Sequence, residues 1–260
     1  MPTVLLVRHG RTSANASGTL AGWTPGIGLD EIGRAQSQAL ATRLATVPVA
    51  AVVTSPLQRC QETVAELVAV PGPKGVSRPA PLVDDRLGEA RYGDWTGRPL
   101  KELAKEPLWR VVQAHPSAVT FPGEQGESML GMQLRAVEAI REHDAAVARE
   151  CGEEAVWVAV SHGDVIKSLL ADALGMHLDA FQRLVVDPCS VSVVRYTPLR
   201  PFALRVNDTG GDLSALAPPR RPRRRRAAAS SGARSGSRSA ARSDAEVSSD
   251  AVVGGSTGTA

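Results

Sequence analysis

Two histidines occupy equivalent places in this 260-residue chain. The sequence RHG, which contains His9, directly follows the apolar run 3–7, and SHG, which contains His162, directly follows the apolar run 155–160. Ligands of α/β proteins bind just beyond the carboxyl ends of strands. A histidine at such a point, with a flexible glycine after it, is well placed to bind an anion. The two motifs therefore predict an anion-binding site between two strand ends.

Two arginines and a helix start add to this predicted anion site. Arg8 precedes the first histidine, and Arg59 lies in the first turn of a predicted helix, in the sequence SPLQR. Two guanidinium groups bind a tetrahedral oxyanion with paired N–H donors, a geometry that lysine does not provide. Gly163 opens another predicted helix, whose backbone N–H groups and dipole attract phosphate or carboxylate. Each of these residues alone is more often structural, but together they indicate an oxyanion site.

Strands and helices alternate along the elements that must position these residues. Short apolar runs are typical of buried strands, and apolar positions spaced three and four apart are typical of helices. Asp30 and Ser55 are predicted to cap the helices that they precede, with Pro56 at a first helical position. The alternation favours an α/β sandwich with a largely parallel sheet. We predict strands at 3–7, 49–53, 155–160, 191–196 and 202–206, and helices at 30–46, 55–69, 99–106, 107–114, 126–150 and 163–174.

The charge of the chain divides at about residue 213. The whole sequence has a net charge of +3, but residues 214–260 hold nine arginines against three acidic residues, which leaves residues 1–213 at −3. The first part is long enough to bury a full core, and its acidity argues against a nucleic-acid-coating protein. Residues 214–260, rich in Arg, Ala, Ser and Gly, are predicted to be a disordered basic tail. Its arginines predict weak, salt-sensitive contact with a polyanion, and a merely solvated tail is the alternative.

Other features argue against membrane and metal classes. No apolar run approaches the roughly 18 residues that a membrane span needs. The N-terminus has no basic region before its short apolar stretch, so we expect a first strand rather than a signal peptide. The cysteines, Cys60, Cys151 and Cys189, lie far apart and form no metal-binding spacing. We expect reduced, mostly buried thiols, a cytoplasmic location, and no metal or other cofactor.

Five blocks of the sequence resemble the histidine phosphatase superfamily, whose members are also called phosphoglycerate mutase-like. In chain order they are VRHGRT, SPLQR, LGEARYGDWTG, GES and VSHG, and the resemblance runs from about residue 3 to residue 206. It implies a phosphoglycerate mutase-like fold for a domain at 1–213. That fold is a three-layer α/β/α sandwich with a mostly parallel central sheet.

The resemblance also implies roles for the predicted anion-binding residues. His9 would be the nucleophile that attacks phosphorus and forms a phosphohistidine. It must be unprotonated at the attacking nitrogen, and the neighbouring Arg8 and Arg59 disfavour its charged form. Arg8, Arg59 and His162 would hold the phosphoryl oxygens and neutralise charge in the transition state. Asn15 matches a family position that hydrogen-bonds the phosphate.

Glu89, within LGEARYGDW, matches the acid that protonates the leaving oxygen and later activates water in the family. Asp84, Asp85 and Asp94 are nearby alternatives for this role. We expect Trp95 to pack in the core. The remaining candidates have structural roles by this comparison: His115, His143 and His177 as surface or capping residues, and Glu127 and Ser128 of the GES block as supports.

The chain departs from the family pattern in two places. An Asp-x-Pro-Leu-Thr stretch is frequent before the second helix, whereas this chain has TPGIGLDE, with Asp30 at the place of the threonine cap. Further along, FPGEQGES carries extra residues relative to a block of the Pro-Gly-Gly-Glu-Ser type. We expect helix capping to survive the first change. We expect the second to alter the rim of the pocket but not the phosphate clamp.

The resemblance implies a histidine acid phosphatase-type phosphohydrolase acting on a small phosphorylated metabolite. A phosphoglycerate mutase-like phosphomutase and a non-catalytic phospho-ligand binder are the alternatives. A mutase holds two phosphates, and such members tend to have a longer, basic insert before the second histidine. Residues 90–161 contain no dedicated basic cluster, so we favour a phosphomonoesterase. Its specificity is expected to lie in the loops 16–29, 71–98 and 107–125.

Overall fold

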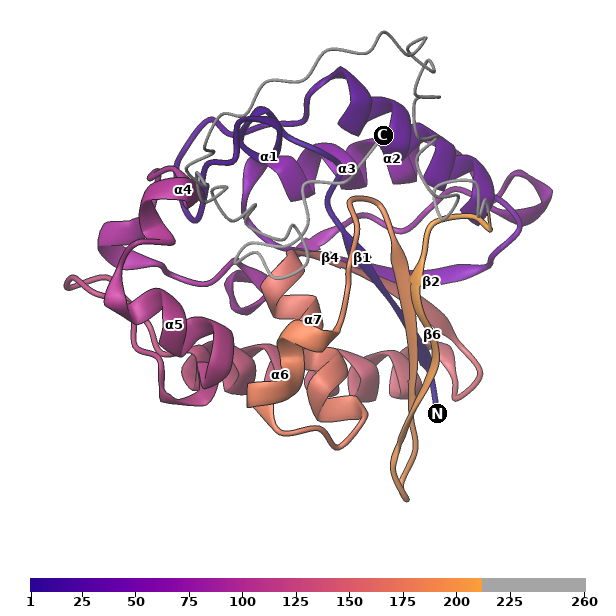
Figure 1. Ribbon diagram of the computed structural model, residues 1–260. Coiled ribbons are helices and arrows are strands. Elements are labelled where there is room, and N and C mark those ends of the chain that lie inside the picture. Colours follow the sequence, from indigo (N-terminus) through magenta and orange to yellow (C-terminus); the bar gives the residue numbers. More distant parts are fainter. Residues whose placement is uncertain (212–260) are drawn as a thin grey trace, which may run out of the picture. The chain divides into compact units, whose positions relative to one another are not determined.

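The computed structural model describes residues 1–211, which form a six-stranded sheet with helices on both faces (Figure 1). The predicted tail at 214–260 and the boundary at residue 213 lie outside the described residues. The strands are β1 (Thr3–Arg8), β2 (Val49–Thr54), β3 (Leu82–Val83), β4 (Val156–Ser161), β5 (Val191–Tyr196) and β6 (Pro201–Asp208). The α-helices are α1 (Ser13–Ser17), α2 (Glu31–Leu44), α3 (Gln58–Ala69), α4 (Leu100–Leu103), α5 (Pro107–Ala114), α6 (Met129–Cys151) and α7 (Gly163–Ala173).

The sheet has the strand order β3-β2-β4-β1-β5-β6. β1 pairs in parallel with β4, and β2 pairs in parallel with β4 and with β3. β5 runs antiparallel to both β1 and β6. Parallel neighbours need a crossover connection, which the helices provide. The mostly parallel sheet and its closing antiparallel pair are therefore confirmed.

Successive side chains of β1 face two different helical layers. Leu5 and Val7 belong to a core cluster that includes side chains of α2 and α3, whereas Val4 and Leu6 belong to one that includes side chains of α6 and α7. Strand side chains alternate between the faces of a sheet, and each buried aliphatic side chain contributes roughly 1.5–3 kcal/mol. Figure 1 shows the pair α2 and α3 on the side of the sheet opposite to α6 and α7. The predicted three-layer α/β/α sandwich is confirmed.

The register of β1 and β4 aligns the two histidine motifs. Arg8, the last residue of β1, is paired with Ser161, the last residue of β4. The backbone N–H of His9 then donates to the carbonyl of Ser161 at 3.0 Å. His162 follows as the N-cap residue of α7. Both histidines therefore follow their strands at the same end of the sheet, as the sequence predicts.

One predicted helix start is wrong. We expect Ser55 to cap a helix with Pro56 in its first turn, but α3 begins at Gln58, and its N-cap residue Leu57 makes no side-chain cap. The Ser55 hydroxyl instead accepts from the backbone N–H of Leu57 at 3.2 Å and forms a 2.7 Å hydrogen bond with His162 Nε2. Its bond to the imidazole thus places this serine in the candidate site.

Of the other predicted elements, α5 (Pro107–Ala114) and β5 (Val191–Tyr196) have the predicted bounds, and the rest have shifted ends. The Asp30 carboxylate accepts from the Gly33 N–H at 2.7 Å, so capping of α2 is confirmed. The short elements α1 and β3 and the 3₁₀ helices have no counterpart in the sequence pattern, because they are too short to show a period. The longest of these 3₁₀ helices is at Leu178–Arg183. α4 covers only part of the predicted 99–106. No helix among residues 1–211 is long and apolar enough to cross a membrane.

Candidate active site

His9 presents one nitrogen as a free base. Its ring is buried, and Nδ1 lies 2.7 Å from the carbonyl oxygen of Gly10. A carbonyl oxygen only accepts hydrogen bonds, so Nδ1 carries the proton and donates. The lone pair of the neutral imidazole is therefore on Nε2. This tautomer has the unprotonated nitrogen that is needed for attack on phosphorus.

Two buried arginines stand near this histidine. Arg8, at the end of β1, donates from Nη1 to the carbonyl of Val186 at 2.7 Å. Arg59, in the first turn of α3, donates from Nη2 to the carbonyl of Gly22 at 2.9 Å. These carbonyl contacts orient both guanidinium groups. Their positive charges sit where the sequence predicts an oxyanion.

Both histidines of the site are held neutral. Burial lowers the pKa of His9 well below its ordinary value, and the charges of Arg59 and Arg8 lower it further. Burial also lowers the pKa of His162, with Arg59 and His9 as the next causes. The predicted lowering of the pKa of His9 by the two arginines is confirmed, although desolvation is the larger cause.

His162 faces His9 across the end of the sheet. Its ring centroid lies 5.2 Å from that of His9, with the rings inclined at 60°. The Ser55 hydroxyl holds Nε2, and the thiol of Cys60 lies 3.5 Å from the same nitrogen. Gly163 is the first residue of the eleven-residue helix α7, so the positive end of the helix dipole points to this region. This arrangement can bind phosphoryl oxygens.

Glu89 is buried beside the second histidine. Its Oε2 lies 4.0 Å from His162 Nδ1, and its Oε1 accepts from the N–H of Ala90 at 3.0 Å. Burial and the charge of Asp164 raise the pKa of this carboxyl to about 7, against the opposing effect of Arg59. A carboxyl with such a pKa exchanges a proton readily at neutral pH, as a general acid and base must.

The alternative carboxylates are placed differently. Although burial opposes its ionisation, hydrogen bonds from Arg86 and His143 lower the pKa of Asp84 to about 2. Asp85 and Asp94 are exposed. Of the four carboxyl groups that the sequence suggests, the glutamate is the one that lies beside a histidine of the site.

Asn15 belongs to the capping box of α1. Its Oδ1 accepts from the backbone N–H of Thr12 at 3.1 Å and from the Thr12 hydroxyl at 2.9 Å, and its own N–H donates to that hydroxyl. The amide oxygen is therefore engaged in holding the turn that follows RHG. A contact of this side chain with phosphate has to come from Nδ2.

Sequence reasoning missed a buried polar group behind the site. Asp164, in the first turn of α7, accepts a 2.8 Å hydrogen bond from the hydroxyl of Tyr92. Lys167, one turn further, is also buried and donates to Gln182 at 3.2 Å. The charge of Asp164 partly offsets the burial that lowers the pKa of Lys167. The available signal was an acidic residue directly after SHG, at a helix start beside two catalytic candidates.

The remaining histidines and the GES block have the structural roles expected. His143 hydrogen-bonds Asp84 at 2.8 Å, His177 caps the 3₁₀ helix after α7, and His115 is exposed. Ser128 caps α6, and Glu127 forms an ion pair with Arg135. Trp95 is buried and contacts aromatic rings of the core, as predicted.

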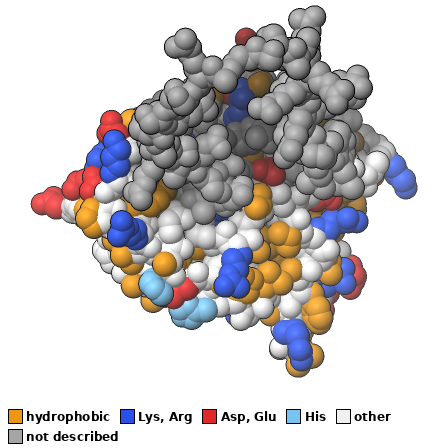
Figure 2. All heavy atoms as spheres, viewed as in Figure 1, with side chains coloured by type: hydrophobic (Ala, Val, Ile, Leu, Met, Phe, Trp, Pro, Cys, Tyr) orange, Lys and Arg blue, Asp and Glu red, His pale blue; other side chains and the backbone are white. Residues whose placement is uncertain are grey.

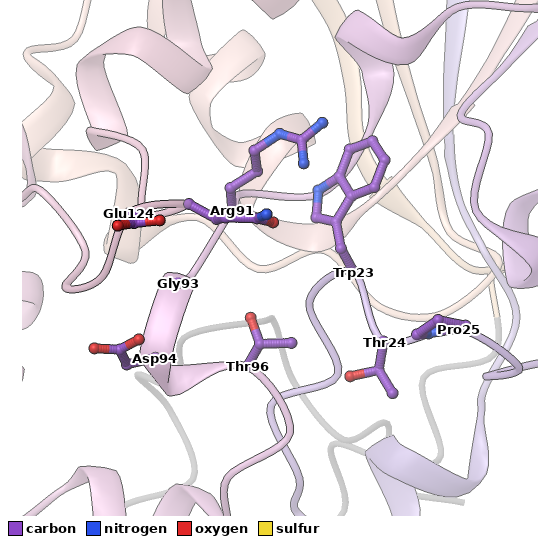
Figure 3. A pocket seen from close by; sticks show the side chains of 9 residues that line it. Trp23, Thr24, Pro25, Arg91, Gly93, Asp94, Thr96 and Glu124 are labelled. Atoms are coloured by element: carbon purple, nitrogen blue, oxygen red, sulfur yellow. The ribbon is translucent and has the colours of Figure 1, made fainter.

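A pocket of about 540 Å³ adjoins the segment that carries Glu89 (Figure 3). Trp23 forms part of its wall and donates from Nε1 to the backbone carbonyl of Glu89 at 2.6 Å. All three loops in which specificity is expected contribute to the lining. The lining residues are Trp23, Thr24, Pro25, Arg91, Gly93, Asp94, Thr96, Glu124 and Gln125.

The positive charge beside His9 comes from buried side chains and not from a basic surface patch. Figure 2 shows basic and acidic side chains interspersed with apolar ones over the described part of the visible face. The cations nearest His9 are instead the buried Arg8 and Arg59. Within residues 1–211, no group of three or more His, Cys, Asp or Glu side chains is arranged to hold a metal ion.

Known proteins share this sequence pattern and this fold. A probable phosphoglycerate mutase GpmB from Yersinia enterocolitica is 32% identical over 200 residues, which cover 75% of this chain and 86% of the relative. The protein YhfR of Bacillus stearothermophilus has a solved structure with a TM-score of 0.67 and 27% identity, covering 80% of this chain and 98% of that one.

A mycobacterial glucosyl-3-phosphoglycerate phosphatase, solved as a complex with VO3, shares the fold with a TM-score of 0.69 and 24% identity. That match covers 79% of this chain and 98% of the other. The family model of the histidine phosphatase superfamily (branch 1) matches residues 4–209. By its motifs, its fold and this match, the chain belongs to the histidine phosphatase superfamily.

Proposed function

We propose that the protein is a phosphomonoesterase that hydrolyses a small phosphorylated metabolite through a phosphohistidine on His9. The observation that carries this proposal is the hydrogen bond from His9 Nδ1 to the carbonyl of Gly10. It leaves Nε2 as the unprotonated nitrogen near two buried arginines. A covalent intermediate divides hydrolysis into two easier displacements.

In the first displacement, His9 Nε2 attacks phosphorus and the ester P–O bond breaks. Glu89 gives its proton to the leaving oxygen, so an alcohol departs. In the second, the Glu89 carboxylate takes a proton from water, whose oxygen bonds to phosphorus while the P–N bond breaks. Inorganic phosphate leaves, and both residues return to their starting forms. A pKa of about 7 suits Glu89 for both steps.

The phosphoryl oxygens would be held by groups from four elements. Arg8 and Arg59 supply guanidinium donors, and His162 and the N–H of Gly163 supply donors at the start of α7. Asn15 can add its Nδ2. Donors fixed in advance at a buried site stabilise the charge that develops in the transition state. The carbonyl contacts of both arginines support this role, because they fix the side chains before substrate arrives.

A phosphomutase is the second candidate, because curated relatives carry the name phosphoglycerate mutase. A mutase must hold a second phosphate near the first. Eight basic residues lie between Glu89 and His162, and Arg91 is the one of them that lines the pocket beside Glu89. Three of them are engaged in ion pairs with neighbouring acids: Arg98 with Glu106, Arg135 with Glu127, and Arg141 with Asp172. This distribution supports hydrolysis.

Transfer of labelled phosphate tests the chemistry directly. Incubation with a ³²P-labelled phosphomonoester should give an acid-labile label on the wild-type chain and none on His9→Ala. An unlabelled wild type would instead indicate a non-catalytic phospho-ligand binder. A second assay with 3-phosphoglycerate, with and without a bisphosphate primer, separates the enzymes. Phosphate release should exceed isomerisation, and faster isomerisation would establish the mutase.

We further propose that the protein is cytoplasmic and histidine acid phosphatase-type in its chemistry, and that residues 214–260 make weak contact with polyanions. Three free thiols support a reducing compartment: Cys60 and Cys189 are buried, and Cys151 is exposed. The net charge of +6 at 214–260 supports an electrostatic contact that weakens as salt rises.

A further inference from the structure

The pocket beside Glu89 gathers both places where the chain departs from its family. Thr24 and Pro25 come from the altered stretch TPGIGLDE, and Glu124 and Gln125 come from the extended block FPGEQGES. Figure 3 shows Arg91 and Trp23 side by side, with Asp94, Thr96 and Thr24 across the pocket from them. The two segments in which this chain departs from the family pattern therefore line the same pocket.

Hydrogen bonds connect the pocket wall to both halves of the catalytic site. The carbonyl of Gly22 accepts from Arg59 at 2.9 Å, and the next residue, Trp23, donates to the carbonyl of Glu89 at 2.6 Å. The indole also packs against Gly88, where an added Cβ would lie 2.4 Å from the Trp23 ring. A leaving group would lie beside this wall if its phosphate were held by Arg59 and its ester oxygen faced Glu89.

The segments that line the pocket are joined by hydrogen bonds that their backbone N–H groups donate. The N–H of Arg91 donates to the Glu127 carboxylate at 2.8 Å, and the N–H of Glu127 donates to the carbonyl of Arg91 at 2.9 Å. The N–H of Asp94 donates to the carbonyl of Pro122 at 2.9 Å. The polar groups that face the pocket are therefore on backbone that is held in place before a ligand binds.

The lining has one cation and two carboxylates, so its formal charge is −1. Asp94 and Glu124 only accept hydrogen bonds when ionised, and hydroxyl groups of a ligand are suitable donors to them. A second phosphate or a carboxylate on the ligand would be repelled by both and attracted by Arg91, so the net effect of the lining on an anion is repulsion. The guanidinium of Arg91 lies 4.0 Å above the Trp23 ring. It occupies the indole face that an ammonium group would otherwise use.

We propose that this pocket binds an uncharged, polyhydroxylated leaving group, so that the preferred substrates are monophosphates of sugars or polyols. The inference rests on the phosphomonoesterase function proposed above. Thr24, Thr96 and Gln125 add neutral donors and acceptors around the carboxylates, which match hydroxyl groups of a ligand.

Steady-state kinetics on four substrates test this assignment. They are a hexose monophosphate, 3-phosphoglycerate, phosphoethanolamine and p-nitrophenyl phosphate. The wild type should show the highest kcat/KM on the hexose monophosphate among the three alkyl phosphates. Preference for either charged alkyl phosphate would overturn the proposal. No turnover on any substrate would instead refute the phosphomonoesterase function, so the two failures are distinguishable.

Substitutions of the two carboxylates, Asp94 and Glu124, test whether the pocket determines the preference for a hexose monophosphate. Asp94→Ala and Glu124→Ala should each lower the ratio of kcat/KM for the hexose monophosphate to that for p-nitrophenyl phosphate by about tenfold, the scale of one hydrogen bond to a charged group. Asp94→Asn should raise relative activity on 3-phosphoglycerate. Glu150→Gln, an exposed change at the far end of α6, should alter neither ratio. Unchanged ratios in the pocket variants would overturn the proposal.

Discussion

The hydroxyl of Tyr92 donates a 2.8 Å hydrogen bond to Oδ2 of Asp164, and both residues are fully buried. Tyr92 lies three residues after Glu89, and Asp164 lies two residues after His162. The bond therefore joins the segment that carries the proposed acid to the helix that starts at the second histidine. It also keeps a negative charge close enough to raise the pKa of the glutamate.

Replacing Asp164 by Asn should move the pH dependence of hydrolysis. A general acid must be protonated in the free enzyme, so kcat/KM falls as pH rises through the pKa of Glu89, which is about 7. Loss of the neighbouring negative charge lowers that pKa, because the ionised form of Glu89 is no longer repelled. In Asp164→Asn, the alkaline limb of the kcat/KM profile for an alkyl phosphate should therefore appear at lower pH.

Tyr92→Phe is the matched control for this shift. It removes the same hydrogen bond but keeps the charge of Asp164, so the alkaline limb should stay close to that of the wild type. Identical profiles for Asp164→Asn and the wild type would show that this carboxylate does not set the pKa of the acid.

Glu89→Gln should lose activity in proportion to the basicity of the leaving group. General acid catalysis typically contributes about 10²–10⁴-fold, and an alkoxide needs the proton that Gln cannot give. p-Nitrophenolate leaves without protonation, so the first step with p-nitrophenyl phosphate should be far less affected. Pre-steady-state bursts on an alkyl phosphate and on p-nitrophenyl phosphate measure that step. Equal losses on both substrates would remove Glu89 from the acid role.

The buried titratable groups predict opposing effects of pH on stability. The pKa values of His9 and His162 are lowered in the folded chain, so their contribution is complete above about pH 6.5 and is lost as pH falls below it. The pKa of Glu89 rises from 4.5 to about 7 on folding. Its contribution is therefore complete below pH 4.5 and is lost as pH rises to 7.

Urea denaturation of Glu89→Gln between pH 4.5 and 6.5 isolates the histidine contribution. The free energy of unfolding should fall with decreasing pH more steeply than in the wild type, because the opposing glutamate is gone. Each histidine contributes a slope on the order of 1 kcal/mol per pH unit. His9→Gln should flatten the slope instead. A slope that neither variant changes would contradict the burial of these groups in the folded state.

Ser55→Ala should reduce turnover more than stability. The hydroxyl holds His162 Nε2 at 2.7 Å, so its loss frees the imidazole to rotate. We expect about a tenfold fall in kcat/KM and a loss of about 1 kcal/mol of stability, the usual scale of one hydrogen bond. Ser168→Ala, a buried serine of α7 bonded to the carbonyl of Val165, is the control. It should lose similar stability with activity retained.

Removal of residues 214–260 should leave turnover on small substrates unchanged, because the family model ends at residue 209. The same truncation should abolish salt-sensitive retention on heparin or polyphosphate resin. A large fall in kcat on p-nitrophenyl phosphate would show that these residues belong to the catalytic unit. Retention that survives truncation would place polyanion binding in the first 213 residues.

The parts of the fold that the sequence predicts well are those fixed by local pattern. The apolar runs at 3–7 and 155–160 became β1 and β4, because continuous aliphatic segments of this length are buried on both faces of a parallel sheet. The same runs placed His9 and His162 at the strand ends. Asp30 capped its helix because an Asx side chain bonds to a backbone N–H three residues on, which is a local event.

Tertiary contacts account for what the sequence did not show. Ser55 followed by Pro56 has every local mark of a helix start, yet its hydroxyl bonds to a histidine 107 positions away. The role of Asp164 depends on Tyr92, which lies 72 positions earlier. Neither pairing has a spacing that one sequence reveals, because each is created when the helical layers pack on the sheet.

Because Arg8 pairs with Ser161, an insertion in either strand and an insertion in a pocket loop should have different effects on the site. Side chains alternate along a strand, so inserting one residue into β1 or β4 would turn a histidine into the opposite layer and end catalysis. Insertions in the loops around residues 24 and 124 leave that pairing untouched. Changes of substrate preference can therefore be confined to these two loops, while the strand register keeps His9 and His162 at the same end of the sheet.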